Sequence, residues 1–214
     1  MATRPVFIPV EEGSRLVMER NFDFNWAPGF AEVQKKKNVH ALHEAARRGG
    51  VQELLEISTK SDDEVGRRLS AFSLKLPIGG RKIPLESAYQ SAKVFRNSGP
   101  FLELMEMSPR EAKRFVRENA RGDLIGFRLN EVEYPLAPKN AFYDWLYIRS
   151  LVDHSDWISE NVRFSGFTDI EFNPQKQVNC QARAFAEFLS LQRRSLLEKT
   201  ANDFGFFASL LSPI

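Results

Sequence analysis

The segment PLESAYQSAKVF, residues 84–95, contains side chains whose types and spacing can do chemistry. At the helical period of 3.6 residues, Glu86, Gln90 and Lys93 fall on one face, and the apolar residues fall on or beside the other. Two helical turns, about 10 Å, separate Glu86 from Lys93. Pro84 suits a first helical turn, so we expect a helix here whose long polar side chains can meet on one ligand.

An amine and a carboxyl in this arrangement suggest covalent or acid–base catalysis. A lysine near apolar groups such as Tyr89 and Phe95 can have its pKa lowered, which makes the neutral amine available to attack a carbonyl-like or glycosidic carbon. The Glu86 carboxyl can then move the proton. The spacing leaves a second interpretation open, in which these residues form a solvated polar face of the helix.

A second polar cluster lies in FTDIEFNPQKQVN, residues 167–179, which puts Asp169, Glu171, Asn173 and Asn179 in a loop before the last long helix. A helix N-terminus offers free N–H groups and a positive dipole, so it can receive a phosphate. The acidic side chains could instead bind ribose hydroxyls. The alternative is a plain capping loop, with Asn179 as the helix cap.

Composition excludes several classes of protein. The chain has 30 Lys and Arg against 28 Asp and Glu, so its net charge of +2 argues neither for nucleic acid nor for a membrane. Cys180 is the only cysteine, which excludes an internal disulfide framework and a cysteine-rich zinc site. GxSxG, P-loop, dinucleotide-binding and HExxH motifs are missing. His40 and His43 lack a third ligand nearby, so we expect no metal. Without a signal-like or membrane-spanning apolar run, we expect a cytoplasmic protein.

The pattern along the chain predicts an α+β fold that is mostly helical, with small antiparallel β elements. Alternation predicts strands in PVFIP and RLVMERNFDFNW, and QELLEIS is typical of another short strand. A helix is expected over 30–48, with Phe30 and Val33 among its core positions and the lysines 35–37 as an exposed run. Hairpin turns are expected at Gly79-Gly80 and around Asn130.

Capping signals predict where several helices begin. Ser61–Glu64 and Ser108–Glu111 both have capping-box spacing. Pro138 is expected to open a helix with a broad buried stripe, and another helix should run through Trp157. Among the aromatic residues, Tyr89, Tyr143 and Trp145 are candidates for stacking on a base, although core packing is the favoured role of Trp145.

Together these motifs resemble the NADAR (YbiA-like) family. The matching parts are SAF at 70–72, PLESAYQSAKVF at 84–95, SPREAK at 108–113 and FTDIEFNPQKQVNCQA at 167–182, and the match covers roughly residues 69–195. Two features depart from the family's pattern: Ala71 stands where an Asn is usual, and the late loop lacks the usual Trp-Gly pair. The N-terminal segment and PLAPKNAFYDWLYIRSL resemble a subgroup encoded beside toxins that ADP-ribosylate guanine in DNA.

The resemblance implies a hydrolase that acts as an antitoxin by removing ADP-ribose from ADP-ribosylated guanine in DNA, without a cofactor. It implies that Lys93 and Glu86 are catalytic, and that the substrate-binding residues are Ser70, Phe72, Tyr89, Gln90, Asp169, Glu171 and Asn179. Lys93 would attack the distal ribose and form a Schiff base; in the alternative route, Glu86 activates a water and Lys93 only holds the substrate. The implied partners are ADP-ribosylated DNA, the ADP-ribose product and a cognate ADP-ribosyltransferase toxin, with no membrane.

Two other functions stay open from the sequence. One is cleavage of a small ribosylated metabolite by the same site, and the other is a non-catalytic protein that binds ADP-ribose or the toxin. We expect residues 1–68 to form an N-terminal extension packed on the core, residues 69–198 the catalytic domain and residues 199–214 a C-terminal tail. The basic residues at 35–37 and 47–48 favour a nucleic-acid substrate over a small molecule.

Overall fold

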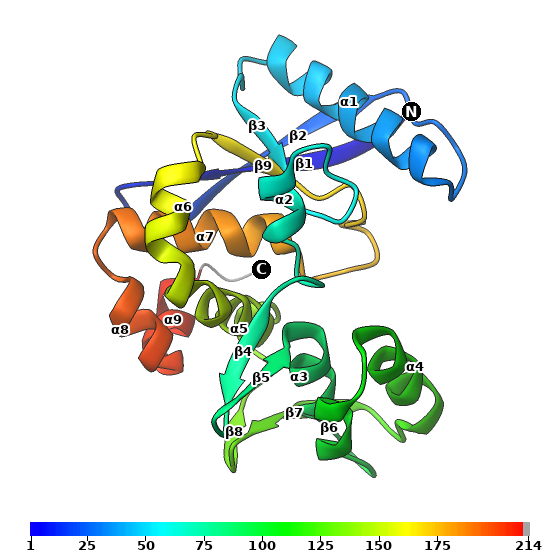
Figure 1. Ribbon diagram of the computed structural model, residues 1–214, viewed down its shortest axis with the longest axis vertical. Coiled ribbons are helices and arrows are strands. Elements are labelled where there is room, and N and C mark those ends of the chain that lie inside the picture. The colour runs from blue at the N-terminus through cyan, green and yellow to red at the C-terminus, as the bar shows by residue number, and fades with distance from the viewer. Residues whose placement is uncertain (212–214) are drawn as a thin grey trace.

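Three separate sheets organise the chain, which a computed structural model describes over residues 1–211 (Figure 1). The strands are β1 (Ala2–Pro9), β2 (Val17–Phe24), β3 (Leu54–Glu56), β4 (Lys75–Ile78), β5 (Arg81–Pro84), β6 (Lys93–Phe95), β7 (Leu124–Leu129), β8 (Val132–Tyr134) and β9 (Gly166–Thr168). The α-helices are α1 (Glu32–Arg48), α2 (Glu64–Arg68), α3 (Leu85–Ser91), α4 (Pro109–Asn119), α5 (Ala141–Leu151), α6 (Ser155–Asn161), α7 (Gln181–Arg193), α8 (Leu197–Asn202) and α9 (Phe204–Leu210), with 3-10 turns η1 (Leu102–Glu106) and η2 (Val152–His154). The α+β class predicted from the sequence is confirmed.

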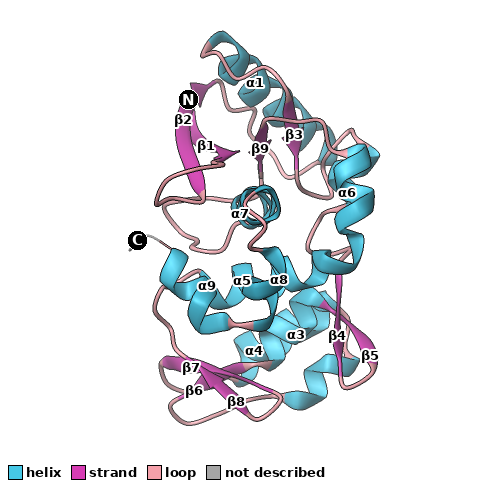
Figure 2. Ribbon diagram, turned by 90° about the vertical axis from the view of Figure 1, so that its left-hand side faces the viewer, coloured by secondary structure: helices cyan, strands magenta, loops and turns pink. Residues whose placement is uncertain are grey.

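The largest sheet has the strand order β2-β1-β9-β3. β1 is antiparallel to both β2 and β9, whereas β3 runs parallel to β9. This parallel pair departs from the predicted antiparallel elements, and β9 lies in a stretch that the sequence indicates as a loop. α1 covers one face of the sheet and α7 the other, and Figure 2 shows α7 end-on between the sheet and α5.

The main hydrophobic core lies around α5 and α7. Of the eleven residues of α5, ten are buried, because this helix packs against α3, α7, α8 and α9. Phe167 from β9 meets Phe185 from α7 edge-on, with ring centroids 4.9 Å apart. Apolar burial of this extent is the main favourable contribution to folding. The four-stranded sheet lies on one side of α7, and the two small sheets lie on the other (Figure 2).

Both predicted hairpins are present. Gly79 and Gly80 have φ values of 55° and 76° between β4 and β5, and Asn130 and Glu131 have φ values of 49° and 63° between β7 and β8. Two consecutive left-handed residues match the right-handed twist of the flanking strands, which is the geometry that a two-residue hairpin requires. The β6-β7-β8 sheet begins two residues after the end of α3.

The predicted helices are present, but several ends differ. The helix expected over 84–95 ends at Ser91, because residues 93–95 leave it to pair with β7 as strand β6. The capping box at Ser108 and Glu111 is confirmed. The one at Ser61 is wrong: the cap of α2 is Asp63, whose side chain accepts a hydrogen bond from the Val65 N–H.

Other predicted positions are also wrong in detail. The cap of α7 is Cys180 rather than Asn179, and α5 begins at Ala141, three residues after Pro138. Phe30 and Val33 are not core residues, since they are 99% and 61% exposed. The apolar face of α1 that packs on the sheet begins further along, at Val39 and Leu42.

The predicted division into an N-terminal extension (1–68), a catalytic domain (69–198) and a tail (199–214) stays a prediction. Strands β1 and β3, from the first 68 residues, join β9 from the later part in one sheet. At the other end, α8 and α9 contact α5, and Phe207 is fully buried in the main core. Residues 212–214 of the predicted tail lie outside the described residues.

We expect Gly66 in α2 to be required for the close approach of α2 to β3. A Cβ at this position would overlap the carbonyl oxygen of Glu56 and the side chain of Ser61. Gly66→Ala should therefore lower the free energy of unfolding by about 1–3 kcal/mol, measured by urea denaturation.

Gly205→Ala in α9 is the matched control. A Cβ there meets nothing nearer than a side-chain oxygen of Asp203 at 3.4 Å. This variant should keep or raise stability, by up to about 1 kcal/mol, because alanine is the better helix former. Equal stability of the two variants would contradict the packing described for α2.

Candidate active site

A cavity of about 620 Å³ opens between α3, α5 and the segment that leads into α7. Its volume lies in the range of sites for nucleotide-sized ligands. The predicted site residues that line it are Lys93, Glu86, Phe72, Tyr89, Gln90, Asp169, Glu171 and Asn179. Ser70 is fully buried outside the lining, where its hydroxyl accepts a hydrogen bond from the Phe72 N–H at 3.4 Å.

Lys93 reaches the cavity from the first position of β6, directly after α3. Its Nζ donates a hydrogen bond to Gln90 Oε1 at 2.8 Å and lies 4.7 Å from the centroid of the Tyr89 ring. The backbone of Lys93 is fixed by pairing with Phe127 of β7. The polar side chains expected on one helical face therefore do share a cavity, although Lys93 arrives there from a strand.

The environment of Lys93 increases the share of its neutral amine. Burial lowers the pKa of Lys93 to about 8, an effect that the charge of Glu86 opposes and that of Lys113 strengthens. Removing an ammonium group from water disfavours its charged form. At pH 7 roughly a tenth of such an amine is unprotonated, compared with well under a thousandth for an exposed lysine.

Two tyrosines position the groups next to this amine. The Tyr143 hydroxyl donates to Glu86 Oε1 at 3.3 Å, and the Tyr143 ring lies edge-on to Tyr89 with centroids 5.1 Å apart. Asn179 Nδ2 donates to the Tyr89 hydroxyl at 2.8 Å. Burial raises the pKa of Tyr89 to about 12, so this hydroxyl stays protonated near neutral pH. Asn179 thus holds Tyr89 in the cavity wall, and its side chain does not cap α7.

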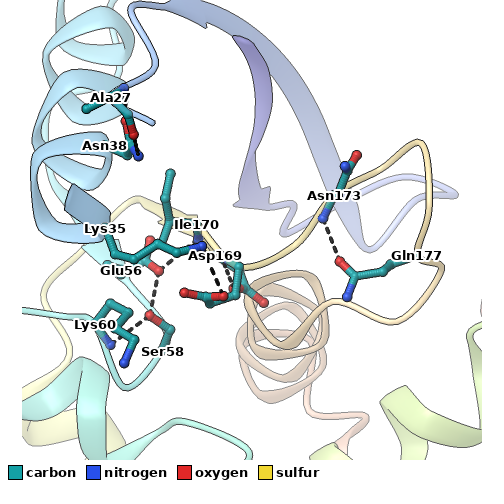
Figure 3. A network of polar contacts seen from close by, with 11 residues as sticks. Ala27, Lys35, Asn38, Glu56, Ser58, Lys60, Asp169, Ile170, Asn173 and Gln177 are labelled. Atoms are coloured by element: carbon teal, nitrogen blue, oxygen red, sulfur yellow. Dashed lines mark hydrogen bonds and ion pairs between the residues drawn. The ribbon is translucent and has the colours of Figure 1, made fainter. Parts of the chain in front are cut away.

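Asp169 is held in the cavity wall by a buried network around Glu56 (Figure 3). Glu56 accepts hydrogen bonds from the Ser58 hydroxyl at 2.7 Å, the Thr168 hydroxyl at 2.7 Å and the Ile170 N–H at 2.8 Å. Thr168 and Ile170 flank Asp169, so Glu56 fixes the backbone on both sides of it. Burial raises the pKa of Asp169 to about 7, and burial together with the Asp169 charge raises that of Glu56 to about 8.

The rest of the late segment is fixed by further hydrogen bonds. Gln177 Oε1 accepts from the Asn173 N–H at 2.6 Å, as Figure 3 shows. Arg183 Nη2 donates to the Val178 carbonyl at 2.6 Å, and Arg183 also pairs with the buried Asp144 at 3.4 Å. This wall of the cavity is therefore tied to α7.

α1 also contributes to the site, which the sequence did not indicate. Lys35 lines the cavity and forms an ion pair with Glu171 at 3.4 Å, with its side chain only 16% exposed. The prediction that residues 35–37 form an exposed run is therefore wrong for Lys35. Gln181 was missed as well: its Oε1 accepts from the Ala71 N–H at 2.8 Å and its side chain lines the cavity.

Comparison with family models decides the relationship suggested by the motifs. The model described as the DarT1-associated NADAR antitoxin matches residues 2–213. The chain belongs to this NADAR antitoxin family. A search of curated proteins finds no match. The match includes the segments before residue 69. In this chain these segments contribute Lys35 to the cavity lining and Glu56 to the network that supports it.

Within residues 1–211, no three His, Cys, Asp or Glu side chains are placed to hold a metal ion. His43 instead makes a 2.8 Å hydrogen bond with the Thr168 hydroxyl, and His40 pairs with Asp62.

No helix among residues 1–211 has the length and apolar character needed to cross a membrane.

We expect Asp169 to make the stability of this NADAR antitoxin depend on pH. Because its folded-state pKa is about 7, above the ordinary 3.8, the folded state binds the proton more tightly than the unfolded state. Its contribution to stability therefore falls as pH rises from about 4 to about 7. Asp169→Asn removes this titration, so the variant should gain stability relative to wild type over that range in urea denaturation series.

The exposed Asp123→Asn is the control, with its side chain 86% exposed in wild type. It should leave the shape of the stability–pH curve unchanged. Parallel curves for wild type and Asp169→Asn would contradict the buried state of Asp169.

Proposed function

We propose that this NADAR antitoxin hydrolyses the N-glycosidic bond between ADP-ribose and ADP-ribosylated guanine in DNA. The observation that supports it is the pairing in one cavity of a half-buried amine of lowered pKa, Lys93, with the tyrosine-bound carboxyl of Glu86. A perturbed nucleophile and a proton carrier in a ligand-sized cavity are typical of a catalytic site. The family match supports the antitoxin role, with the DarT1 toxin as the partner whose modification is reversed.

In the proposed first step, the neutral Nζ of Lys93 attacks the anomeric carbon of the distal ribose, and the bond from that carbon to the guanine nitrogen breaks. Glu86 takes the proton that the attacking amine loses and passes it to the leaving nitrogen. The ribose ring then opens: its carbon–oxygen bond breaks, the oxygen gains a proton, and the lysine nitrogen forms an imine.

Water completes the reaction. It adds to the imine carbon, the Lys93 amine leaves, and the freed aldehyde of ADP-ribose closes again to its ring. The net change consumes one water and yields ADP-ribose and unmodified guanine. Tyr89 and Gln90 hold the free amine before it attacks, and Asp169 is positioned to bind ribose hydroxyls.

In this proposal the pyrophosphate of ADP-ribose lies at the N-terminus of α7. Val178, Asn179 and Gln181, which surround the start of this helix, line the cavity. The free N–H groups and positive dipole of a helix N-terminus favour a phosphate there.

Removing either catalytic side chain should abolish or greatly reduce activity without unfolding the protein. On ADP-ribosylated oligonucleotide, Glu86→Ala should lower kcat by about 10²–10⁴-fold, and Lys93→Ala should lose measurable release of ADP-ribose. The release is followed by chromatography, and circular dichroism checks the fold. Lys82→Ala is the control, since Lys82 is exposed on β5 away from the cavity. Full activity in both Lys93→Ala and Glu86→Ala would refute the proposal.

The pH profile separates the two chemical roles of Lys93. As a nucleophile the amine must be neutral, so kcat/KM should rise with pH up to about 8, the lowered pKa of Lys93, and then level off. If Lys93 only holds substrate as a cation, kcat/KM should instead fall above that pH. Borohydride should trap a covalent adduct on wild type and none on Lys93→Arg, because only an imine is reduced.

A further inference from the structure

Two aromatic side chains stand exposed at the mouth of the cavity. Phe30 is 99% exposed and Phe72 is 51% exposed, and both line the cavity. They come from segments far apart in sequence, since Phe30 lies directly before α1 and Phe72 follows α2. Single exposed apolar residues are common on proteins, but two exposed aromatic side chains that line one cavity are typical of a binding surface.

The fold gives Phe30 no structural role. α1 packs on the large sheet through Val39 and Leu42, more than two turns after Phe30. The nearby Val33 is also exposed, at 61%, but it does not line the cavity. Unlike its exposed neighbour Val33, Phe30 is an aromatic side chain that lines the cavity.

The same cavity carries positive charge. Lys60 and Lys113 line the cavity, and over residues 1–211 neither forms an ion pair. The exposed acidic residue of the lining, Glu171, is paired with Lys35. Exposed aromatic faces and unpaired lysines that line one cavity match a strand of nucleic acid, in which bases alternate with phosphates.

We propose that this mouth binds the nucleic-acid strand that flanks the modified guanine, with Phe30 stacked on a neighbouring base and Lys60 and Lys113 on phosphates. The inference rests on the proposed function, because the modified nucleotide fills the cavity itself. Stacking requires an open base face, so the strand is single at this point. Phe30 thereby selects polynucleotide over small ribosylated substrates and makes the N-terminal segment part of substrate recognition.

The test compares ADP-ribosylated guanosine monophosphate with a longer ADP-ribosylated single-stranded DNA. For wild type, kcat/KM should be higher on the longer strand. In Phe30→Ala the ratio of kcat/KM on the strand to that on the mononucleotide should fall about 5- to 100-fold, the usual effect of one lost base stack. Val33→Ala should keep the wild-type ratio, since it removes exposed apolar surface outside the cavity.

Three results would overturn the inference. An unchanged ratio in Phe30→Ala excludes the stack. An equal loss on both substrates places Phe30 on ADP-ribose. An unchanged ratio with weaker binding of the toxin assigns the aromatic rim to a protein partner.

A binding measurement with unmodified DNA tests this inference separately from the proposed reaction. Even if wild type cleaves neither substrate, fluorescence anisotropy should show salt-sensitive binding of unmodified single-stranded DNA, weakened in Phe30→Ala. Lys60→Ala should bind more weakly with a smaller salt dependence, because one phosphate contact is lost. No binding by wild type at low salt would refute the docking surface.

Discussion

The site depends on the burial of the Lys93 amine and on its contacts with Gln90 and Tyr89. Moving an ammonium group out of water is costly, and here the loss is offset by Gln90 Oε1 and the face of Tyr89. Burial lowers the pKa of Lys93 to about 8, because neither of these partners carries a full negative charge that would compensate for the lost hydration. A lysine paired tightly with a carboxylate would stay protonated and would be a poor nucleophile. The lowered pKa is therefore a direct consequence of which groups surround the amine.

The geometry around Lys93 requires distant parts of the chain. Pairing of β6 with β7 ends α3 and turns the lysine into the cavity, while Asn179 fixes the ring of Tyr89. The opposite wall depends on the large sheet, because the β3–β9 pair brings Glu56 beneath the backbone on either side of Asp169. The N-terminal segment and the later part of the chain thus build one site together, consistent with a family match that covers both.

The sequence correctly predicted local features, whose formation depends on only a few adjacent residues. The Ser108–Glu111 capping box and the turns at Gly79-Gly80 and Asn130 are local, and each is present. Glu86 and Lys93 line one cavity as predicted, but helical spacing is not the reason, because α3 ends before Lys93. A strand pairing with β7, over thirty positions away, could not be seen in the local pattern that favoured a longer helix.

Features that depend on long-range pairing were missed for the same reason. β9 is a three-residue strand, too short for a periodic signal, and it is stabilised by β1 and β3. Lys35 looked like part of a solvated basic run because its partner, Glu171, is 136 residues away. Asn179 has the residue type of a cap, but its amide bonds to Tyr89 instead, and that choice is set by tertiary packing.

The most direct test of the account is a crystal structure of the protein with ADP-ribose bound. The account predicts the distal ribose between Lys93 and Glu86, with its anomeric carbon within reach of Lys93 Nζ and the pyrophosphate near the start of α7. ADP-ribose bound outside this cavity, or bound in it with the distal ribose turned away from Lys93, would contradict the account.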